Sequence, residues 1–449
     1  MATQTRIRRS AATSAAVLLA ALAAAATPST APSPSMAQAL PTVEHEELDA
    51  DELSLMGNAG RPKDSTKPKV TAYFTRESYG PRDRAQLVVT DRASSLAVQI
   101  YRAGGETVET VPNDVILGVP VTRAIPIGSV HGRRTIAVPL GVWQSGVYFA
   151  RLTAPGARVG YAPFILRPGH LGEHRIAVVL PTETWQAYNF RDDDGDGRPN
   201  TWYAGWKTHH ARLIRPFLDR GVPPHWKQYD APFVRWLTAT HRAVDYLSDA
   251  ELRRAGSGDE LAAAYDLLIF SGHHEYVTTH EYDVVQRYRD LGGNLAFLAA
   301  NNFFWKITIS HDMMTRVAQW RELGRPEAAL IGVQYRANDR GGHRGPWILR
   351  RGAASVPWLF TETGLTPGDP VGSGGIEIDA TAPSSPKRTE VLAEIPNLYG
   401  HGFTAQMTYY ETPAGAHVFA AGAFSLAGSV WSPGIGRLVS NLWSRLAAR

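Results

Sequence analysis

The chain has 449 residues, 44% hydrophobic and 20% charged, which is enough for two or three folded domains. It has no cysteine, so disulfides, thiol nucleophiles and cysteine metal sites are excluded. The formal net charge is +4, and removal of residues 1–39 takes away Arg6, Arg8 and Arg9 but no acidic residue, which leaves +1. Such a nearly neutral chain offers no basic surface for nucleic acid.

The first 39 residues have the pattern of a secretory signal peptide. The arginines precede an uncharged apolar stretch, Ala11 to Ala26, and Ala37-Gln38-Ala39 fits a small-x-small cleavage site. We therefore predict an exported protein, secreted or held at the cell envelope, without a stable membrane span. An N-terminal anchor helix is the alternative, and the Arg8-Arg9 pair leaves general and twin-arginine export both open. Residues 40–67, rich in Glu, Asp, Pro and Lys, are predicted to form a disordered linker.

Residues 68–170 alternate apolar and polar side chains with period two, and Gly-Pro, Gly-Gly and Pro-Gly pairs separate many of the runs. Several short strands divided by such turns are typical of a β-sandwich, here of the immunoglobulin-like type. The predicted strands are Val70 to Phe74, Leu87 to Thr90, Ala97 to Tyr101, Thr135 to Val138, Val147 to Leu152 and Ala162 to Leu166. For this segment we predict packing rather than chemistry.

Residues 171–449 change to continuous apolar runs separated by helical patterns. The runs are Ile176 to Leu180, Leu267 to Phe270 and Leu295 to Ala300. The helical patterns include Ala211 to Arg220 and His280 to Leu291. Buried runs that alternate with helices indicate an α/β domain with a parallel sheet covered on both faces. Ligands of such sheets bind outside the carboxyl ends of the strands.

Polar side chains follow each of the three apolar runs, so we expect them to meet in one crevice. His273 and Glu275 lie two residues apart, which places both on one face of an extended chain and suits metal ligation or acid–base work. His274 points away and receives no role. Asn301 and Asn302 follow the third run, where an amide can stabilise a developing oxyanion or, alternatively, cap a helix.

A second candidate metal site is an acidic turn. Asp192, Asp194 and Asp196 place oxygen ligands at alternate residues around Gly195 and match the first half of a calcium loop. The twelfth position is Tyr203 instead of the bidentate glutamate. The turn is therefore predicted either to bind Ca²⁺ or to be a solvated acidic turn.

Three segments carry a family resemblance: PTETWQAYN, YDLLIFSGHHEY and GGNLAFLAANNFFW. They resemble the C-terminal half of the large (beta) subunit of N,N-dimethylformamidase. The resemblance implies a β-sandwich-like region followed by an α/β domain of the class I glutaminase, flavodoxin-like type over residues 171–449. A glutaminase-type sheet alone would say little about function.

The resemblance also implies a mononuclear iron(III) held by two tyrosines and one glutamate. The matching residues here are Tyr188, Tyr229 and Glu275, with Tyr203 as the substitute for Tyr229. Iron(III) is a hard cation that prefers anionic oxygen, and only deprotonated tyrosine binds it. A cation with an open coordination position can polarise an amide carbonyl or activate water.

His273, Asn301 and Glu411 are the catalytic residues that the resemblance implies around this cation. Glu411 would take the proton of the attacking water, while His273 and Asn301 would position the amide or stabilise its oxyanion. The predicted function is an exported amidohydrolase-like enzyme that hydrolyses a small C–N amide bond. A separate small subunit is expected from the family, and a homo-oligomer is the alternative.

Two other hypotheses remain open at this point. The first is a non-catalytic, calcium-dependent protein that binds carbohydrate or a cell-surface partner and keeps a vestigial crevice. The second retains catalysis by His273, Glu275 and Glu411 without iron, either metal-free or with another cation, because tyrosine and glutamate ligands do not identify a metal.

Overall fold

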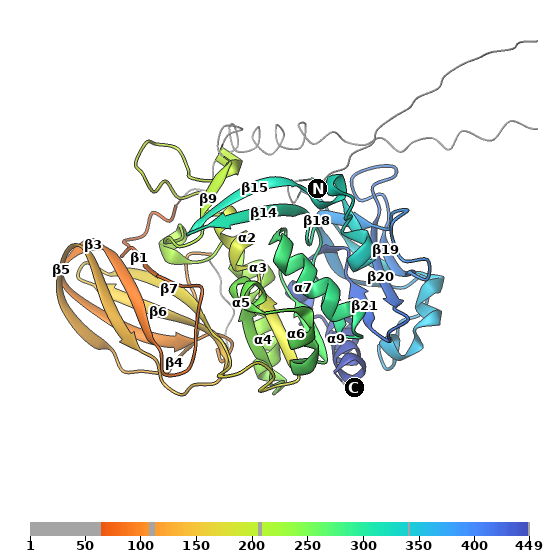
Figure 1. Cartoon of the computed structure of the whole chain (residues 1–449), viewed down its shortest axis with the longest axis horizontal. Helices are drawn as coiled ribbons and strands as arrows, with labels where there is room; N and C mark the ends of the chain where they lie inside the picture. The colour runs from red at the N-terminus through yellow and green to blue at the C-terminus, as the bar shows by residue number, and fades with distance from the viewer. Residues whose placement is uncertain (1–63, 107–112, 205–208, 340–341, 448–449) are drawn as a thin grey trace, which may run out of the picture. The chain divides into compact units, whose positions relative to one another are not determined.

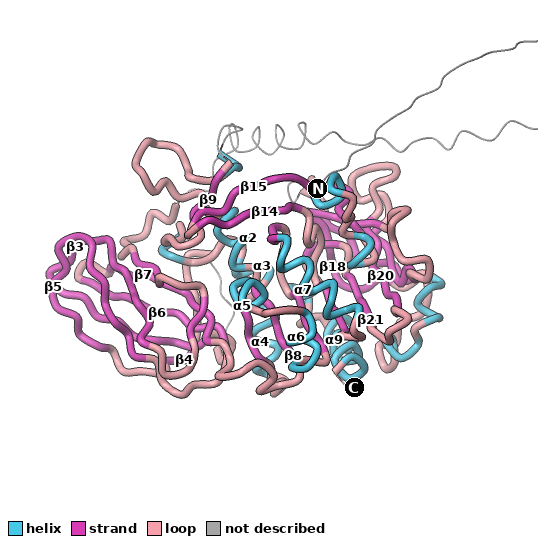
Figure 2. The backbone as a smooth tube through the Cα atoms, in the orientation of Figure 1, coloured by secondary structure: helices cyan, strands magenta, loops and turns pink. Residues whose placement is uncertain are grey.

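The computed structural model describes residues 64–106, 113–204, 209–339 and 342–447. The predicted signal peptide and most of the predicted linker lie outside these residues. In the described part of the chain, no helix is long and apolar enough to cross a membrane. Figures 1 and 2 show that strands dominate the structure. Of the described residues, 37% are in strands and 23% in helices.

The N-terminal part forms one bent antiparallel sheet with a single parallel pair, β2 with β7. Its strands are β1 (Ala72–Phe74), β2 (Ser78–Tyr79), β3 (Arg84–Arg102), β4 (Val119–Pro120), β5 (Ile125–Pro139), β6 (Gly146–Ala154) and β7 (Arg158–Leu166). The long strand β3 pairs with β1 and β5 along its first part and with β6 at its end. The inward side chains form one core, as the period-two alternation requires.

The larger sheet has eleven strands and is mixed. In spatial order the main path is β10 (Asp245–Ser248), β8 (Ile176–Leu180), β11 (Leu267–Phe270), β13 (Asn294–Phe297), β21 (His417–Ala420), β20 (Ala405–Glu411), β19 (Glu390–Ile395), β17 (Arg344–Leu349), β18 (Pro370–Ala380) and β16 (Gln334–Asn338). The first five strands are parallel, and all later neighbours, including β22 (Ala423–Phe424) beside β18, are antiparallel.

The predicted fold class, a parallel flavodoxin-like α/β domain, is therefore wrong. The apolar runs do form parallel strands, but the antiparallel half of the sheet makes the C-terminal part β-rich. The glycine-rich segment Gly372 to Gly375 lies inside β18. A side chain at Gly374 would stand 2.7 Å from the ring of Trp347 on the neighbouring strand β17, so close strand packing explains this glycine.

Both faces of the parallel strands are buried. Val178 and Ile269 face one core, which helices α4 (Ala231–Ala239) and α9 (Pro433–Leu446) cover. Val179 and Phe270 face the other core, beneath helices α5 (Asp249–Arg254), α6 (Gly258–Ala264) and α7 (Thr279–Asp290) (Figure 1). The apolar runs are continuous because every residue of these strands packs against one of the two cores.

A four-stranded sheet and several short helices complete the described structure. The sheet contains β12 (Tyr276–Thr278), β14 (Trp305–Ser310), β15 (Met313–Gln319) and β9 (His210–Arg212). The short helices are α2 (Thr182–Ala187), α3 (Trp226–Tyr229) and α8 (Ala328–Ile331). The predicted helix over Ala211 to Arg220 is wrong, because that segment starts in β9 and ends in a short 3₁₀ turn, whereas the predicted helix over His280 to Leu291 is confirmed as α7.

Four buried carboxyl groups crowd one arginine in the last turn of α5. Arg253 donates to Glu77 and Glu183 and lies 3.5 Å from Glu281, and all three glutamate side chains are almost inaccessible. Asp249 adds a fourth carboxyl group, whose pKa is raised by burial and by the charges of Glu281 and Glu77. One cation cannot neutralise four carboxylates, so ionisation of this cluster opposes folding.

We predict that Glu281→Gln makes stability less dependent on pH. Burial raises the pKa of Glu281 to about 7, so the folded state holds this proton more tightly than the unfolded state and loses stability as pH rises from about 4.5 to about 7. Glutamine retains the capping contact to Thr278 without the charge. The melting temperatures at about pH 5 and about pH 8 should therefore lie closer together in the variant. An unchanged difference would contradict this origin, and Glu260→Gln on an exposed position is the control.

Candidate active site

The carboxyl ends of β8 and β11 and the inner strand β18 bring the candidate residues together. Helix α2 follows β8 and ends at Tyr188, and Glu275 lies between β11 and β12. The Glu275 N–H donates to the Thr184 hydroxyl at 3.2 Å, which ties the two loops to each other. The polar segments after these strands therefore converge, as their positions in the sequence predicted.

Glu275 is the centre of a buried phenol–carboxylate cluster. Its Oε2 accepts hydrogen bonds from the Tyr188 hydroxyl at 2.7 Å and from the Tyr203 hydroxyl at 3.1 Å. The Tyr203 hydroxyl also contacts that of Tyr276. Burial raises the pKa of Glu275 to about 7, and the two tyrosine hydrogen bonds oppose this shift. A nearby cation would reverse it, because an opposite charge favours the ionised carboxylate.

His273 lies on the same side as Glu275, whereas His274 does not. The Nε2 of His273 is 3.5 Å from Glu275 Oε2 and 3.4 Å from Glu377 Oε2, too long for well-formed hydrogen bonds. Burial lowers the pKa of His273, so its imidazole is neutral, and the two carboxylates favour the tautomer with the proton on Nε2. His274 packs on the opposite side, 4.0 Å from Asp249, as predicted.

Glu377 is the site residue that the sequence did not reveal. It lies on β18, where Glu377 and Asp379 alternate with Ile376 and Ile378, so both acids share one face. Glu377 approaches His273, and Asp379 accepts the backbone N–H of Asn301 with both oxygens, at 2.9 and 3.0 Å. The alternation of acidic and apolar residues could have revealed this strand in the sequence, but the glycines that precede it obscured the pattern.

Asn301 is held in the left-handed backbone region, with φ +52°, a conformation that asparagine tolerates. Burial raises the pKa of its partner Asp379 to about 7. The Asn301 Oδ1 is buried and has no hydrogen-bond partner among the described residues. An exogenous donor is therefore the expected partner of this amide, because buried polar atoms are normally paired.

Tyr229 joins the site through a cavity of about 470 Å³ that Tyr188, His273 and Glu377 also line. The ring of Tyr229 packs against His225 and Phe424, each with ring centres 5.1 Å away. Burial and then the Glu377 carboxylate raise the pKa of the Tyr229 phenol. Tyr203 donates to Glu275 as well but is not among the residues that line this cavity.

Glu411 is not brought to the site. It lies at the exposed end of β20 and pairs with His417, the first residue of β21. The His417 N–H donates to the side chain of Asn294, the first residue of β13. Glu411 therefore lies at the amino-terminal edge of the parallel strands, opposite the edge that carries Glu275. Its resolved contacts are with Tyr409 at 2.6 Å and His417 at 3.4 Å.

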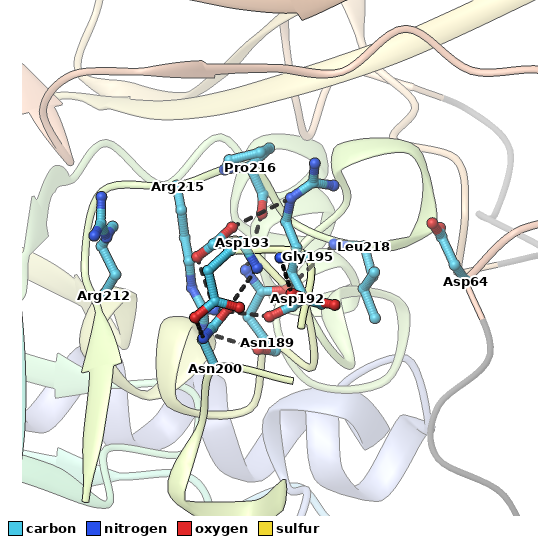
Figure 3. Close-up of polar contacts among 12 residues, drawn as sticks. Asp64, Asn189, Asp192, Asp193, Gly195, Asn200, Arg212, Arg215, Pro216 and Leu218 are labelled. Carbon is cyan, nitrogen blue, oxygen red and sulfur yellow. Dashed lines mark hydrogen bonds and ion pairs between the residues drawn. The ribbon is translucent and has the colours of Figure 1, made fainter. Parts of the chain in front are cut away.

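The acidic turn is shown in Figure 3. Ligand oxygens of Asp192, Asp194 and Asp196 lie within 4.8 Å of one another. Asp192 accepts backbone N–H groups of Gly195 and Gly197, which are contacts internal to the turn. The twelfth position supplies no ligand, because Tyr203 is buried against Glu275. Calcium binding here stays a prediction.

Arg215 connects this turn to the main site. Its guanidinium donates to the backbone carbonyls of Gln186 and Asn189 at 2.9 and 2.8 Å and to the carboxylate of Asp193 at 3.2 Å (Figure 3). Because these carbonyls flank Tyr188, the buried cation fixes the backbone that carries that tyrosine.

The donor set of the main site fits a hard cation. Tyr188, Tyr229 and Glu275 offer two phenol oxygens and one carboxylate, and oxygen is the ligand atom that hard cations prefer. The Nε2 of His273 is buried and has no hydrogen-bond partner among the described residues. Because buried polar atoms are normally paired, we expect this nitrogen to bind a ligand or a water molecule.

Comparison with known families gives one decisive match. The profile described as N,N-dimethylformamidase beta subunit-like, C-terminal, matches residues 133–434. The chain belongs to this family. The resemblance found in the sequence is thereby confirmed.

Two curated relatives carry the same family name. The N,N-dimethylformamidase beta subunit of Paracoccus aminophilus is 28% identical over 184 residues, which are 40% of this chain and 23% of that protein. The beta subunit from Alcaligenes sp is 25% identical over 305 residues, which are 54% of this chain and 39% of that protein. The chain thus spans less than half the length of these relatives.

Solved structures add nothing further. A cycloisomaltooligosaccharide glucanotransferase of Paenibacillus sp. is 10% identical, with 51% of this chain and 45% of that chain covered, but the TM-score is 0.16. A score this low supports no argument about fold or function.

Proposed function

We propose that this member of the N,N-dimethylformamidase beta subunit-like family hydrolyses the C–N bond of an amide and uses a cation held by Tyr188, Tyr229 and Glu275. The observation that carries the proposal is one cavity lined by Tyr188, Tyr229, His273 and Glu377, with Glu275 bound to the Tyr188 hydroxyl behind it. Iron(III) is the cation we propose. When bound, it would supply Lewis-acid polarisation of the amide carbonyl or activation of water.

The remaining groups have complementary tasks in amide hydrolysis. Glu377 takes the proton from the attacking water, since it is the carboxylate nearest to His273 besides the ligand Glu275. The neutral His273 lies 3.4 Å from Glu377, and its Nε2, which has no hydrogen-bond partner among the described residues, is available to donate to the substrate or the attacking water. Asn301, whose backbone N–H is fixed by Asp379, is the residue that we assign to the tetrahedral oxyanion, which the NH₂ group of its side chain can stabilise.

The proposal includes export and assembly with a second chain. The N-terminal pattern of basic, apolar and small residues supports export. The names of the two relatives, each of which is called a beta subunit, support assembly.

The test is metal analysis of the exported, folded protein, together with its visible spectrum and release of amine from dimethylformamide. We expect about one iron per chain, the broad absorption of a phenolate–iron(III) bond, and hydrolysis that is lost when a chelator removes the metal and restored with iron. A colourless, iron-free protein that iron does not reconstitute would refute the proposal. A calcium-dependent rise in melting temperature in such a sample would instead favour the calcium-dependent binding protein.

A further inference from the structure

The cavity beside the candidate metal ligands is larger than the smallest amides require. Its volume is about 470 Å³. A water molecule takes about 30 Å³ in the liquid, so the cavity has the volume of about fifteen waters. Dimethylformamide, with about five non-hydrogen atoms, would fill about a third of it. The volume lies within the range of pockets that bind much larger ligands.

The walls of this cavity are mainly apolar. The apolar side chains among the lining residues are Phe190, Leu218, Val222, Pro224, Ile376 and Phe424. Half of them come from the segment 218–224, which no step of amide hydrolysis uses. Apolar walls stabilise a ligand in proportion to the apolar surface that leaves water, so this segment favours a substrate with an apolar arm.

The imidazole ring of His225, directly after the apolar segment 218–224, forms a flat part of the cavity wall. The backbone of this residue is left-handed, with φ +57°, and its ring stacks on Tyr229 at 5.1 Å with 25° between the planes. His225 is exposed and is one of the residues that line the cavity.

The charges of the lining disfavour an anionic substrate. The described residues that line the cavity include two acids, Asp219 and Glu377, and neither lysine nor arginine. Asp219 is engaged by the side chain of Asn113. A carboxylate on the substrate would lose its hydration and meet two acidic groups, with no lysine or arginine in the lining to offset them. The charge of the proposed iron(III) would already be balanced by its three anionic ligands.

Resting on the proposed amide hydrolysis, we propose that the substrate is an uncharged amide with an apolar arm, about ten non-hydrogen atoms in total. The arm lies along residues 218–225, and the amide group reaches Tyr188, His273 and Glu377. The site therefore selects larger neutral amides over dimethylformamide and over amides that bear a carboxylate.

Calorimetric titration of the purified protein with a series of N,N-dialkylformamides tests the proposal without relying on turnover. Each methylene that leaves water raises affinity about fourfold, so burial of three of the six methylenes that separate dibutylformamide from dimethylformamide gives about 60-fold tighter binding. N-butylformamide should bind at least about tenfold more tightly than 4-formamidobutanoate, a carboxylate of similar length.

Substitutions in the cavity wall test where the apolar arm of the substrate binds. Leu218→Trp fills part of the cavity and should reduce the ratio of dibutylformamide to dimethylformamide affinity at least about tenfold. Leu323→Trp, at a residue that is 45% exposed and outside the cavity, should leave the ratio unchanged. Equal affinity for both formamides, with dimethylformamide still bound and hydrolysed, would overturn this inference alone. Failure to bind or hydrolyse any amide would overturn the proposed function and the inference together.

Discussion

Replacement of Glu275 by glutamine should remove the proposed metal and with it the proposed hydrolytic activity. Glutamine preserves the shape of the side chain but supplies no negative charge to a cation held by Tyr188 and Tyr229. Altering even the partners of metal ligands costs about 10–100-fold in affinity, so loss of a ligand should cost at least about 100-fold. Metal content after dialysis, measured with the visible absorption, reports this loss directly.

The fold should survive this change. Burial raises the pKa of Glu275 to about 7, so a neutral side chain suits its surroundings without a cation, and Tyr188 and Tyr203 can still donate to the glutamine oxygen. The melting temperature of the metal-free variant should match that of metal-free wild type. Glu362→Gln, at an exposed glutamate paired with Arg437, is the matched control. Full metal occupancy in Glu275→Gln would remove this residue from the ligand set.

Replacement of Glu377 by glutamine should abolish turnover while the metal stays bound. General acid–base groups contribute about 10²–10⁴-fold to rate, and we expect kcat to fall within this range while KM changes much less. Turnover should depend on Glu377 because this residue lines the cavity and lies 3.4 Å from His273. Metal binding should not depend on it, because Glu377 is not one of the three proposed ligands. Steady-state kinetics with metal analysis of the same sample separates the two effects.

Glu411→Gln provides the comparison for Glu377→Gln. Glu411 was the catalytic residue expected from the sequence, but it is exposed at the other edge of the sheet, against Tyr409 and His417. Its replacement should leave kcat within about twofold, as surface changes away from a site normally do. A large loss in Glu411→Gln together with an active Glu377→Gln would restore the original assignment.

Sequence reasoning located the site well where the signal was local. Continuous apolar runs marked parallel strands, and the polar residues after them, Tyr188, His273 and Glu275, do converge. Tyr188 and Tyr229 were assigned by the family resemblance, and the two line one cavity. The convergence of the polar segments themselves was predicted from strand ends and period-two geometry, which are properties of short segments.

The antiparallel half of the sheet and the identity of the second acid were decided by the tertiary structure. Strand β16 alternates buried and partly exposed residues, and β18 contains glycines, so both carry a weaker pattern than the buried runs. Which strand neighbours which is set by pairings between residues far apart in sequence. Those pairings place Glu377 beside His273 and carry Glu411 to the opposite edge. A linear pattern determines which residues are extended, whereas only the packed sheet determines which of its edges each side chain reaches.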